Sequence, residues 1–315
     1  PASGHFTIGG AWPATVNGRP QLIDLYGSAT LYDSLPHLPD DHDRQYHHEA
    51  RELPDGRLLA MEEIPVSRPA GGTFDGFRVM LVDPETDQVD FSYSSQRAFD
   101  EGHLRGGGGD VYHANWADVV DGVLYVSLCY ASSVVAIDVP SGDWRWRFGP
   151  QQGDFTLQDA NGDPIPDNEY PQCQHGLQVR GNRLLVYDNG NNGRNYSRAV
   201  EYLLDESTMT ATKLWDWTED DWFQRAMGGV DYTTGGNVLI AAGHLESFTP
   251  TPGDRSTFLE IDPGTGDKLW EVKYGDRVDS AYRAEAIAPC ALFANAKYCP
   301  VVETRLENLA PVLAP

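Results

Sequence analysis

Three histidines introduce similar segments of the sequence, and histidine is the side chain best suited to proton transfer near neutral pH. His48, His113 and His175 each precede a short polar segment, a turn with glycine and an apolar run. Gly229 and Arg283 stand at the corresponding place in two later segments. One histidine at a strand start is usually structural, whereas three at equivalent places indicate a shared acid–base or nucleophilic site. Arg283 would add a cation to it.

The segments that these residues introduce recur along most of the chain. Their first residues lie between 54 and 65 residues apart, which is typical of repeat architectures. Each of the first four is followed by two apolar runs that flank an acidic turn marked by Gly or Pro, as in a β-hairpin. A further hairpin lies near the N-terminus. We predict these hairpins at residues 19–34, 77–93, 133–149, 198–217 and 256–275.

Two hairpins per repeat make a four-stranded antiparallel sheet, and sheets repeated at this period predict an all-β fold, a β-propeller. The sequence has no sustained helical periodicity, which agrees with this fold class. We expect a single domain over residues 1–315 with six blades, and five blades as the alternative. The first strand of a propeller blade usually lines the central channel. The residues that open the repeats should therefore converge near one mouth of that channel.

The charge of the chain restricts its partners. The formal net charge is −24, which argues against nucleic acid as a partner, because phosphate contacts need clustered Lys and Arg. The same charge argues against anionic membrane surfaces. No run of about 18 apolar residues is present, so no transmembrane helix is expected. We expect a small aromatic or anionic substrate, and an anionic one would need a local positive site. The sequence does not indicate an oligomeric state.

The cysteines and the first residue favour an exported protein. Cys290 and Cys299 are close enough in the sequence to close a small disulfide loop. Cys129 and Cys173 cannot be paired from the sequence. The chain begins at Pro1 without Met, as after removal of a signal peptide. A periplasmic or extracellular location is therefore expected.

The repeat segments resemble the bacterial arylsulfotransferase (arylsulfate sulfotransferase) family. The matching pieces are HHEARELPDGRLL, YHANW with its following strand, QHGLQV-RGNRLLVYDNGN, YSRAVEY and YRAEA, in that order. Together they span about residues 47 to 286. The resemblance implies a six-bladed propeller with the active site in a central funnel.

The same resemblance implies the activity. Members of the family transfer a sulfuryl group from an aryl sulfate to a phenol through a sulfohistidine. By motif the nucleophile looks like His175, assisted by His48 and His113. Asn115 could orient His113 or donate to the ligand. Tyr112, Trp116 and Tyr130 are candidates for stacking on a phenol, with core packing as the alternative role for each.

Two positions bear on the sulfate site that the family implies. The family carries a functional arginine on the strand that returns from the His-x-Asn motif, and this chain has Cys129 there. Losing a fixed cation from a sulfate site should cost about 3 kcal/mol of transition-state stabilisation. Arg283, at the equivalent repeat position, is the candidate replacement for that cation. Arg198 matches the family's Ser-Arg pair and is a candidate for substrate binding, although it begins an outer hairpin.

Other polar stretches have simpler interpretations. Asp159, Asn161 and Asp163 alternate as in a Ca²⁺ loop but lack the complete EF-hand pattern, so a solvated acidic loop is preferred to a calcium site. The Gly-rich stretch 105–110 is interpreted as a flexible approach to His113. Residues 188–190 are interpreted as a turn. No other cofactor is expected.

Two further hypotheses use the same three histidines. In one, they serve different acid–base chemistry, as in a lyase, hydrolase or cyclase, and Cys129 in place of arginine favours it. In the other, the propeller only binds a ligand, or the three imidazoles hold a metal such as Zn²⁺.

Overall fold

The computed structural model describes residues 5–8, 21–24, 29–31, 46–83, 85–86, 88–191, 193–243, 256–274 and 282–286. At the strands before residue 48, and at residue 274, only the backbone is described. The chain divides into two compact units, Pro1–Phe148 and Gly149–Pro315, and each is described by itself. The predicted single domain stays a prediction.

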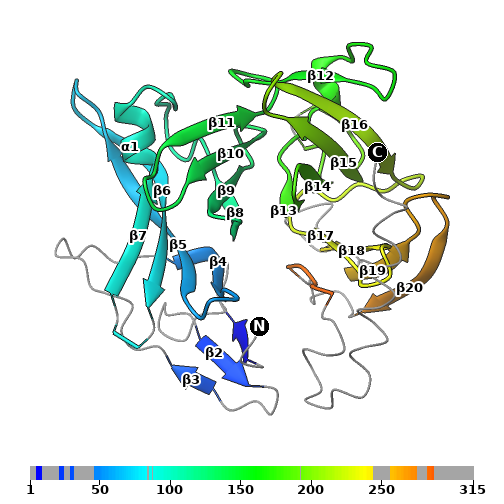
Figure 1. Ribbon diagram of the computed structural model, residues 1–315, viewed down its shortest axis with the longest axis horizontal. Coiled ribbons are helices and arrows are strands. Elements are labelled where there is room, and N and C mark those ends of the chain that lie inside the picture. Colours follow the sequence, from blue (N-terminus) through cyan, green and yellow to red (C-terminus); the bar gives the residue numbers. More distant parts are fainter. Residues whose placement is uncertain are drawn as a thin grey trace. The chain divides into compact units, whose positions relative to one another are not determined.

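The first unit contains three antiparallel sheets (Figure 1). The first has three strands, β1 (His5–Ile8), β2 (Gln21–Asp24) and β3 (Ala29–Leu31). The second has four, β4 (Tyr46–Glu52), β5 (Leu58–Ser67), β6 (Thr73–Asp83) and β7 (Gln88–Ser94). The third also has four, β8 (Ala114–Val120), β9 (Val123–Leu128), β10 (Ser133–Asp138) and β11 (Trp144–Phe148).

The second unit contains two sheets. One has β13 (His175–Arg180), β14 (Arg183–Asp188), β15 (Arg198–Asp205) and β16 (Thr210–Trp217), joined by β12 (Thr156–Gln158). β12 pairs parallel to β16, which makes a fifth strand that the repeat did not predict. The other sheet has β17 (Gly229–Tyr232), β18 (Val238–Ala242), β19 (Ser256–Ile261) and β20 (Lys268–Tyr274).

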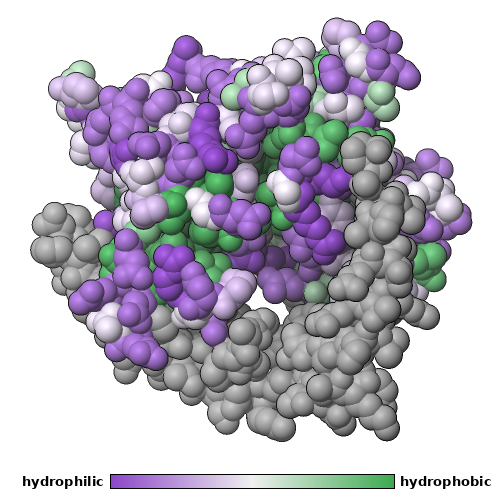
Figure 2. Space-filling view, in the orientation of Figure 1, coloured by the Kyte–Doolittle hydropathy of each residue, from purple (hydrophilic) through white to green (hydrophobic). Residues whose placement is uncertain are grey.

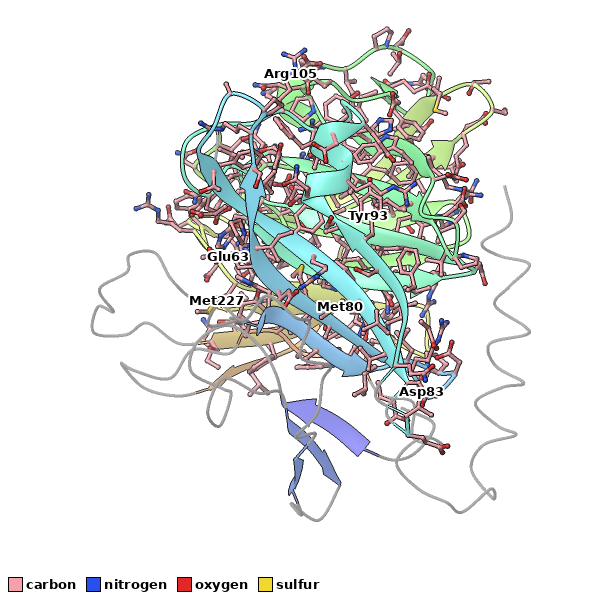
Figure 3. The ribbon with its side chains drawn as sticks, turned by 90° about the vertical axis from the view of Figure 1, so that its left-hand side faces the viewer. Glu63, Met80, Asp83, Tyr93, Arg105 and Met227 are labelled. Carbon is pink, nitrogen blue, oxygen red and sulfur yellow. The ribbon has the colours of Figure 1, made fainter. Side chains whose placement is uncertain are left out.

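These sheets confirm the predicted nearly all-β fold. Within each four-strand set, the strands pair in chain order, and the hairpins expected from the turn residues are all present. Helices are short in the described residues, namely α1 (Ser95–Asp100) and a 3₁₀ turn at Asp167–Glu169. α1 contacts β5, β6 and β7, and Figure 3 shows it beside that sheet near Tyr93. Ring closure and blade number stay predictions.

The two four-stranded sheets of the first unit share a core, and so do the two sheets of the second unit. In the first unit, Met61 and Leu81 from one sheet belong to the same buried cluster as Val126 and Val135 from the next. In the second unit, Tyr187 packs in a cluster with Ile240 and other residues of the following sheet. Such face-to-face burial stabilises sheets that could not bury both faces alone. Hydrophilic residues predominate on the described surface seen in Figure 2, as the composition predicts.

The predicted first strands begin with an irregular backbone. His48 and His113 have positive φ angles of 64° and 45°. The register shifts between Tyr46 and Ala50 in β4, and between Ala114 and Trp116 in β8. β13 shows the same shift around Gly176, whose φ is 47°. A left-handed non-glycine residue costs about 1–3 kcal/mol and persists where surrounding contacts hold it, so these strand starts are special positions.

Candidate active site

His48 and His113 lie next to each other in the first unit. Their ring centroids are 4.9 Å apart and the rings are nearly perpendicular. His48 is 9% exposed, whereas the His113 side chain is 29% exposed. The structure therefore brings together two of the three histidines singled out in the sequence, with one buried and the other reachable from solvent.

Asp110 holds His113 at two points. One carboxylate oxygen, Oδ1, accepts a hydrogen bond from the His113 backbone N–H at 2.7 Å. The other, Oδ2, is 2.6 Å from Nδ1 of the His113 ring. A carboxylate on Nδ1 orients an imidazole and stabilises its protonated form, as in other acid–base pairs. Sequence reasoning treated the stretch ending at Asp110 as flexible and missed this residue. Its spacing of three residues before His113, at which an Asp side chain often accepts from a backbone N–H, was the available signal.

Further carboxyl groups lie near His113 and Asp110. Burial, with further contributions from the nearby Asp75 and Asp110 carboxylates, raises the pKa of Glu63 above its usual range, and His113 opposes that rise. Figure 3 labels Glu63 on the sheet of β4 to β7. The surroundings of His113 thus include several carboxyl groups, those of Glu63, Asp75 and Asp110.

The aromatic candidates of this unit divide into surface and core. The Tyr130 ring stacks on His113 with centroids 4.7 Å apart, and Tyr130 is 51% exposed. Tyr112 is buried against Phe74 and donates its hydroxyl to the Arg105 carbonyl. Tyr112 therefore has the packing role that was the alternative, and Tyr130 is the ring that a phenol could reach.

Asn115 and Trp116 follow His113 on β8 and are both buried. The Arg51 guanidinium lies 5.7 Å from the centroid of the Trp116 ring, so Trp116 is part of the core. Asn115 occupies the position where β8 loses register with β9. Nδ1 of His113 contacts Asp110, so the predicted support of His113 by Asn115 stays a prediction.

His175 begins β13 in the second unit and is 4% exposed. Its Nδ1 lies 2.8 Å from Oδ1 of Asn189. Asn189 directly follows β14 and is completely buried. The sequence indicated only a turn at this residue, because nothing local shows which distant side chain it will meet.

Tyr282 and Arg283 lie beside the His175 segment. The Tyr282 and His175 ring centroids are 6.3 Å apart, and the Tyr282 carbonyl accepts from the Gly228 N–H at 2.8 Å. A Cβ atom placed on Gly229 would lie 3.3 Å from Cβ of Arg283. The space beside Gly229 therefore adjoins Arg283. The structure thus brings the predicted cation Arg283 to the same strand starts as the predicted nucleophile.

Arg198 is an internal anchor of the second unit. Its Nε donates to Asp188 at 3.0 Å, and its Nη1 donates to Glu169 at 2.7 Å and Asp216 at 2.9 Å. Its side chain is 1% exposed. Burial alone would raise the pKa of Glu169, but hydrogen bonds from Arg198 and Lys213 lower it to about 2. These contacts give Arg198 a structural role and are not those of a substrate-binding cation.

Asp188 connects this network to the His175 loop. Its Oδ1 accepts from the backbone N–H of Gln172 at 2.8 Å and of Gly190 at 3.2 Å, on either side of His175 and Asn189 in the sequence. Its Oδ2 accepts from Arg194 and Arg198. Arg198 therefore supports, through Asp188, the backbone just before His175 and just after Asn189.

Cys129 and Cys173 are both disulfide-bonded and buried. Cys129 follows β9, and its N–H donates to the His113 carbonyl at 3.2 Å. A disulfide sulfur has no proton to donate, so Cys129 is a poor replacement for the arginine of the family and belongs to the framework. Cys290 and Cys299 lie outside the described residues.

Among the described residues, no group of three or more His, Cys, Asp or Glu side chains could hold a metal ion. Asp159 uses its Oδ1 to accept from the N–H groups of Asn161 at 2.8 Å and Asp163 at 3.0 Å. These bonds close a turn of the backbone. The described geometry of this loop does not support the calcium alternative.

The fold and these residues define a class, namely a nearly all-β protein of mainly antiparallel sheets that carries histidines at or near the starts of strands. The family model for arylsulfotransferase (ASST) matches residues 4–283. The chain belongs to the arylsulfotransferase family, as its repeat segments predicted. No curated protein matches the sequence.

Solved structures match only distantly. A putative 6-phosphogluconolactonase from Bacteroides uniformis is 13% identical with a TM-score of 0.48, and the match covers 91% of this chain and 86% of that one. Virginiamycin B lyase from Staphylococcus aureus is 11% identical with a TM-score of 0.41, covering 85% and 81%. Hydrazine synthase from Kuenenia stuttgartiensis is 16% identical with a TM-score of 0.41, covering 76% of this chain and 53% of that one.

Proposed function

We propose that this protein transfers a sulfuryl group between phenolic compounds through a covalent intermediate on His175. Membership of the arylsulfotransferase family supports the general reaction. The observation that carries the assignment of the nucleophile is the contact of His175 Nδ1 with Asn189 at 2.8 Å. That contact leaves Nε2 as the nitrogen that can attack.

In the first half-reaction, the Nε2 lone pair of His175 attacks the sulfur of an aryl sulfate. A bond forms between Nε2 and sulfur, the bond between sulfur and the aryl oxygen breaks, and the electron pair stays on that oxygen. Protonated His113 donates its proton to the departing oxygen. Arg283 offsets the charge of the sulfuryl oxygens, since cationic donors stabilise developing anions best.

The second half-reaction is the reverse with a new phenol. Neutral His113 takes the phenol proton, the phenol oxygen attacks sulfur, and the bond between Nε2 and sulfur breaks. The lone pair returns to Nε2, and both histidines regain their first state. His48 contacts the His113 ring and positions it, and Tyr130 stacks on the aryl group. The assisting roles of His48 and His113 rest on the family resemblance and belong to this proposal.

Mass spectrometry can test the nucleophile. The protein is mixed with an aryl sulfate, quenched and digested, and we expect one added SO₃ group on the peptide that contains His175. His175→Gln should abolish both this adduct and transfer. His103→Gln is the matched control, because His103 stacks on Trp144 and has no role in the proposed mechanism. Transfer without an adduct on His175 would overturn the assignment.

A second candidate is an acid–base enzyme such as a lyase, hydrolase or cyclase. The pair of Asp110 and His113 favours it, because a carboxylate–imidazole pair moves protons without any covalent intermediate. The disulfide-bonded Cys129 also favours this candidate, because the family has an arginine at that position and a disulfide supplies no cation for a sulfuryl group. In that case His113→Ala would lose activity, and no sulfated histidine would form with any donor.

We propose an oxidising location, the periplasm or the outside of the cell. The disulfide-bonded Cys129 and Cys173 support it, because structural disulfides are rare in reducing compartments. No helix within the described residues is long and apolar enough to cross a membrane.

A further inference from the structure

The side-chain amide of Asn189 has one possible orientation. Its Nδ2 donates to the backbone carbonyl of Gln224 at 2.9 Å and to that of Met227 at 2.9 Å. Carbonyl oxygens only accept hydrogen bonds, so the atom that faces them must be the amide nitrogen. The atom 2.8 Å from Nδ1 of His175 is therefore the amide oxygen.

An amide oxygen beside Nδ1 decides where His175 carries its proton. The oxygen can only accept, so Nδ1 must carry a hydrogen in order to donate. In the neutral ring the other nitrogen, Nε2, then holds the lone pair. A histidine in water exchanges between two tautomers, and this contact removes one of them.

The support of Asn189 is itself rigid. Ser197 Oγ donates to the Asn189 carbonyl at 3.0 Å and accepts from the Gln224 N–H at 2.8 Å. Ser197 and Asn189 are both fully buried. Met227 has a left-handed φ of 64°, in the turn that presents its carbonyl to Asn189. The amide is thus held at its nitrogen by two backbone carbonyls and at its backbone by a buried hydroxyl.

We infer that Asn189 is the positioning residue that keeps His175 in the tautomer protonated at Nδ1, with the carbonyls of Gln224 and Met227 as its anchors. Asn189 acts through His175 and does not itself meet the substrate. The consequence for sulfuryl transfer rests on the proposed function, whereas the tautomer does not. A neutral amide suits a nucleophile, because a carboxylate in its place would favour a protonated ring that cannot attack.

The tautomer can be measured directly on the folded protein. We would label the histidines with nitrogen-15 and record long-range nitrogen–proton correlation spectra above pH 7, assigning His175 by its loss in His175→Gln. We expect the pattern of a ring protonated at Nδ1. A ring protonated at Nε2 in the unaltered protein would overturn the inference, and this measurement needs no variant of Asn189 to fold.

Asn189→Ala adds a second measurement. We expect the His175 signals to move toward a mixture of the two tautomers. We also expect kcat to fall about 10–100-fold with a smaller change in KM, the size of effect seen when the hydrogen-bond partner that orients a functional histidine is removed. Asn237→Ala is the matched control, since Asn237 donates its amide to Glu260 in the same unit. Unchanged His175 signals in a folded Asn189→Ala would contradict the role. Protonation at Nδ1 without any adduct on His175 would overturn the proposed function alone.

Discussion

At the scale of single residues, the partners of the two candidate catalytic histidines differ in charge. His113 has a carboxylate at Nδ1, and His175 has an amide oxygen. A carboxylate stabilises an imidazolium, and a neutral acceptor does not. These different partners support the proposal that His113 does the acid–base chemistry and that His175 is the nucleophile, although both side chains are the same residue type.

Asp110→Asn should lower kcat/KM for transfer by about 10²-fold or more, because His113 would lose the carboxylate that orients its ring at Nδ1. The amide oxygen can still accept from the His113 N–H, so the fold should persist. Steady-state kinetics across pH measures the effect. Asp121→Asn, in the turn between β8 and β9, is the control. Equal profiles for both variants would refute the role of Asp110.

At the scale of elements, the close approach of β13 and β17 positions His175 and Arg283. A Cβ atom on Gly176 would lie 2.5 Å from the Gly229 Cα, and Gly176 has a φ of 47°. The strand starts can approach only because both residues lack side chains. The repeats predicted that the residues opening them converge, but they did not indicate that Gly176 and Gly229 would touch.

Gly176→Ala should destabilise the protein by about 2–4 kcal/mol, combining the left-handed backbone penalty with overpacking against Gly229. Gly181→Ala is a matched control, since Gly181 has a φ of 56° and no atom within 4 Å of its built Cβ. The control should lose only the backbone part, about 1–2 kcal/mol. Urea denaturation measures both, and equal losses would show that the approach to Gly229 is unimportant.

The charge network around Arg198 predicts a stability that depends on pH. The folded pKa of Glu169 is about 2, below its ordinary value of 4.5. A lowered pKa means that the ionised form stabilises the fold above pH 4.5, and that this contribution is lost as the pH falls toward 2. Allowing for its partial exposure, Glu169→Gln should cost about 1–3 kcal/mol at pH 7.

Urea denaturation of this variant and the unaltered protein at pH 7, 4 and 2 measures the difference. The gap between them should shrink as the pH falls. Glu206→Gln, in the exposed turn between β15 and β16, is a control that should show little change. A gap that stays constant with pH would mean that Glu169 stabilises the unit by packing and not by its charge.

At the scale of the whole molecule, the disulfide bonding of Cys129 and Cys173 adds to the stability that strand pairing and core packing provide. Within each four-strand set the strands pair in chain order, and neighbouring four-strand sets of one unit share a core. Reduction should lower the free energy of unfolding by about 2–4 kcal/mol, because the reduced unfolded chain has more conformations. Thermal denaturation with and without a thiol reductant measures this, and Cys129→Ser should reproduce it. An unchanged Tm after verified reduction would contradict the structural role of Cys129.

The amino-acid sequence by itself determined the nearly all-β fold and the sheet order. Turn residues and apolar alternation act over a few neighbours, so they can be recognised without knowing the fold. The same local patterns located His48, His113 and His175 at the starts of strands. They also carried the resemblance to the arylsulfotransferase family, which the match over residues 4–283 confirms.

Only the tertiary structure decided which partners these histidines have. Asn189 is 14 residues from His175, and its anchors in the Gln224 to Met227 turn are 35 and 38 residues beyond it. Hydrogen bonds over such separations depend on how strands pair, and residue types leave no mark of them in the sequence. The same reason explains why Arg198 and Cys129, chosen as ligand contacts by motif position, have structural partners. The residue type fixes which groups a side chain carries, whereas the fold decides which distant groups contact it.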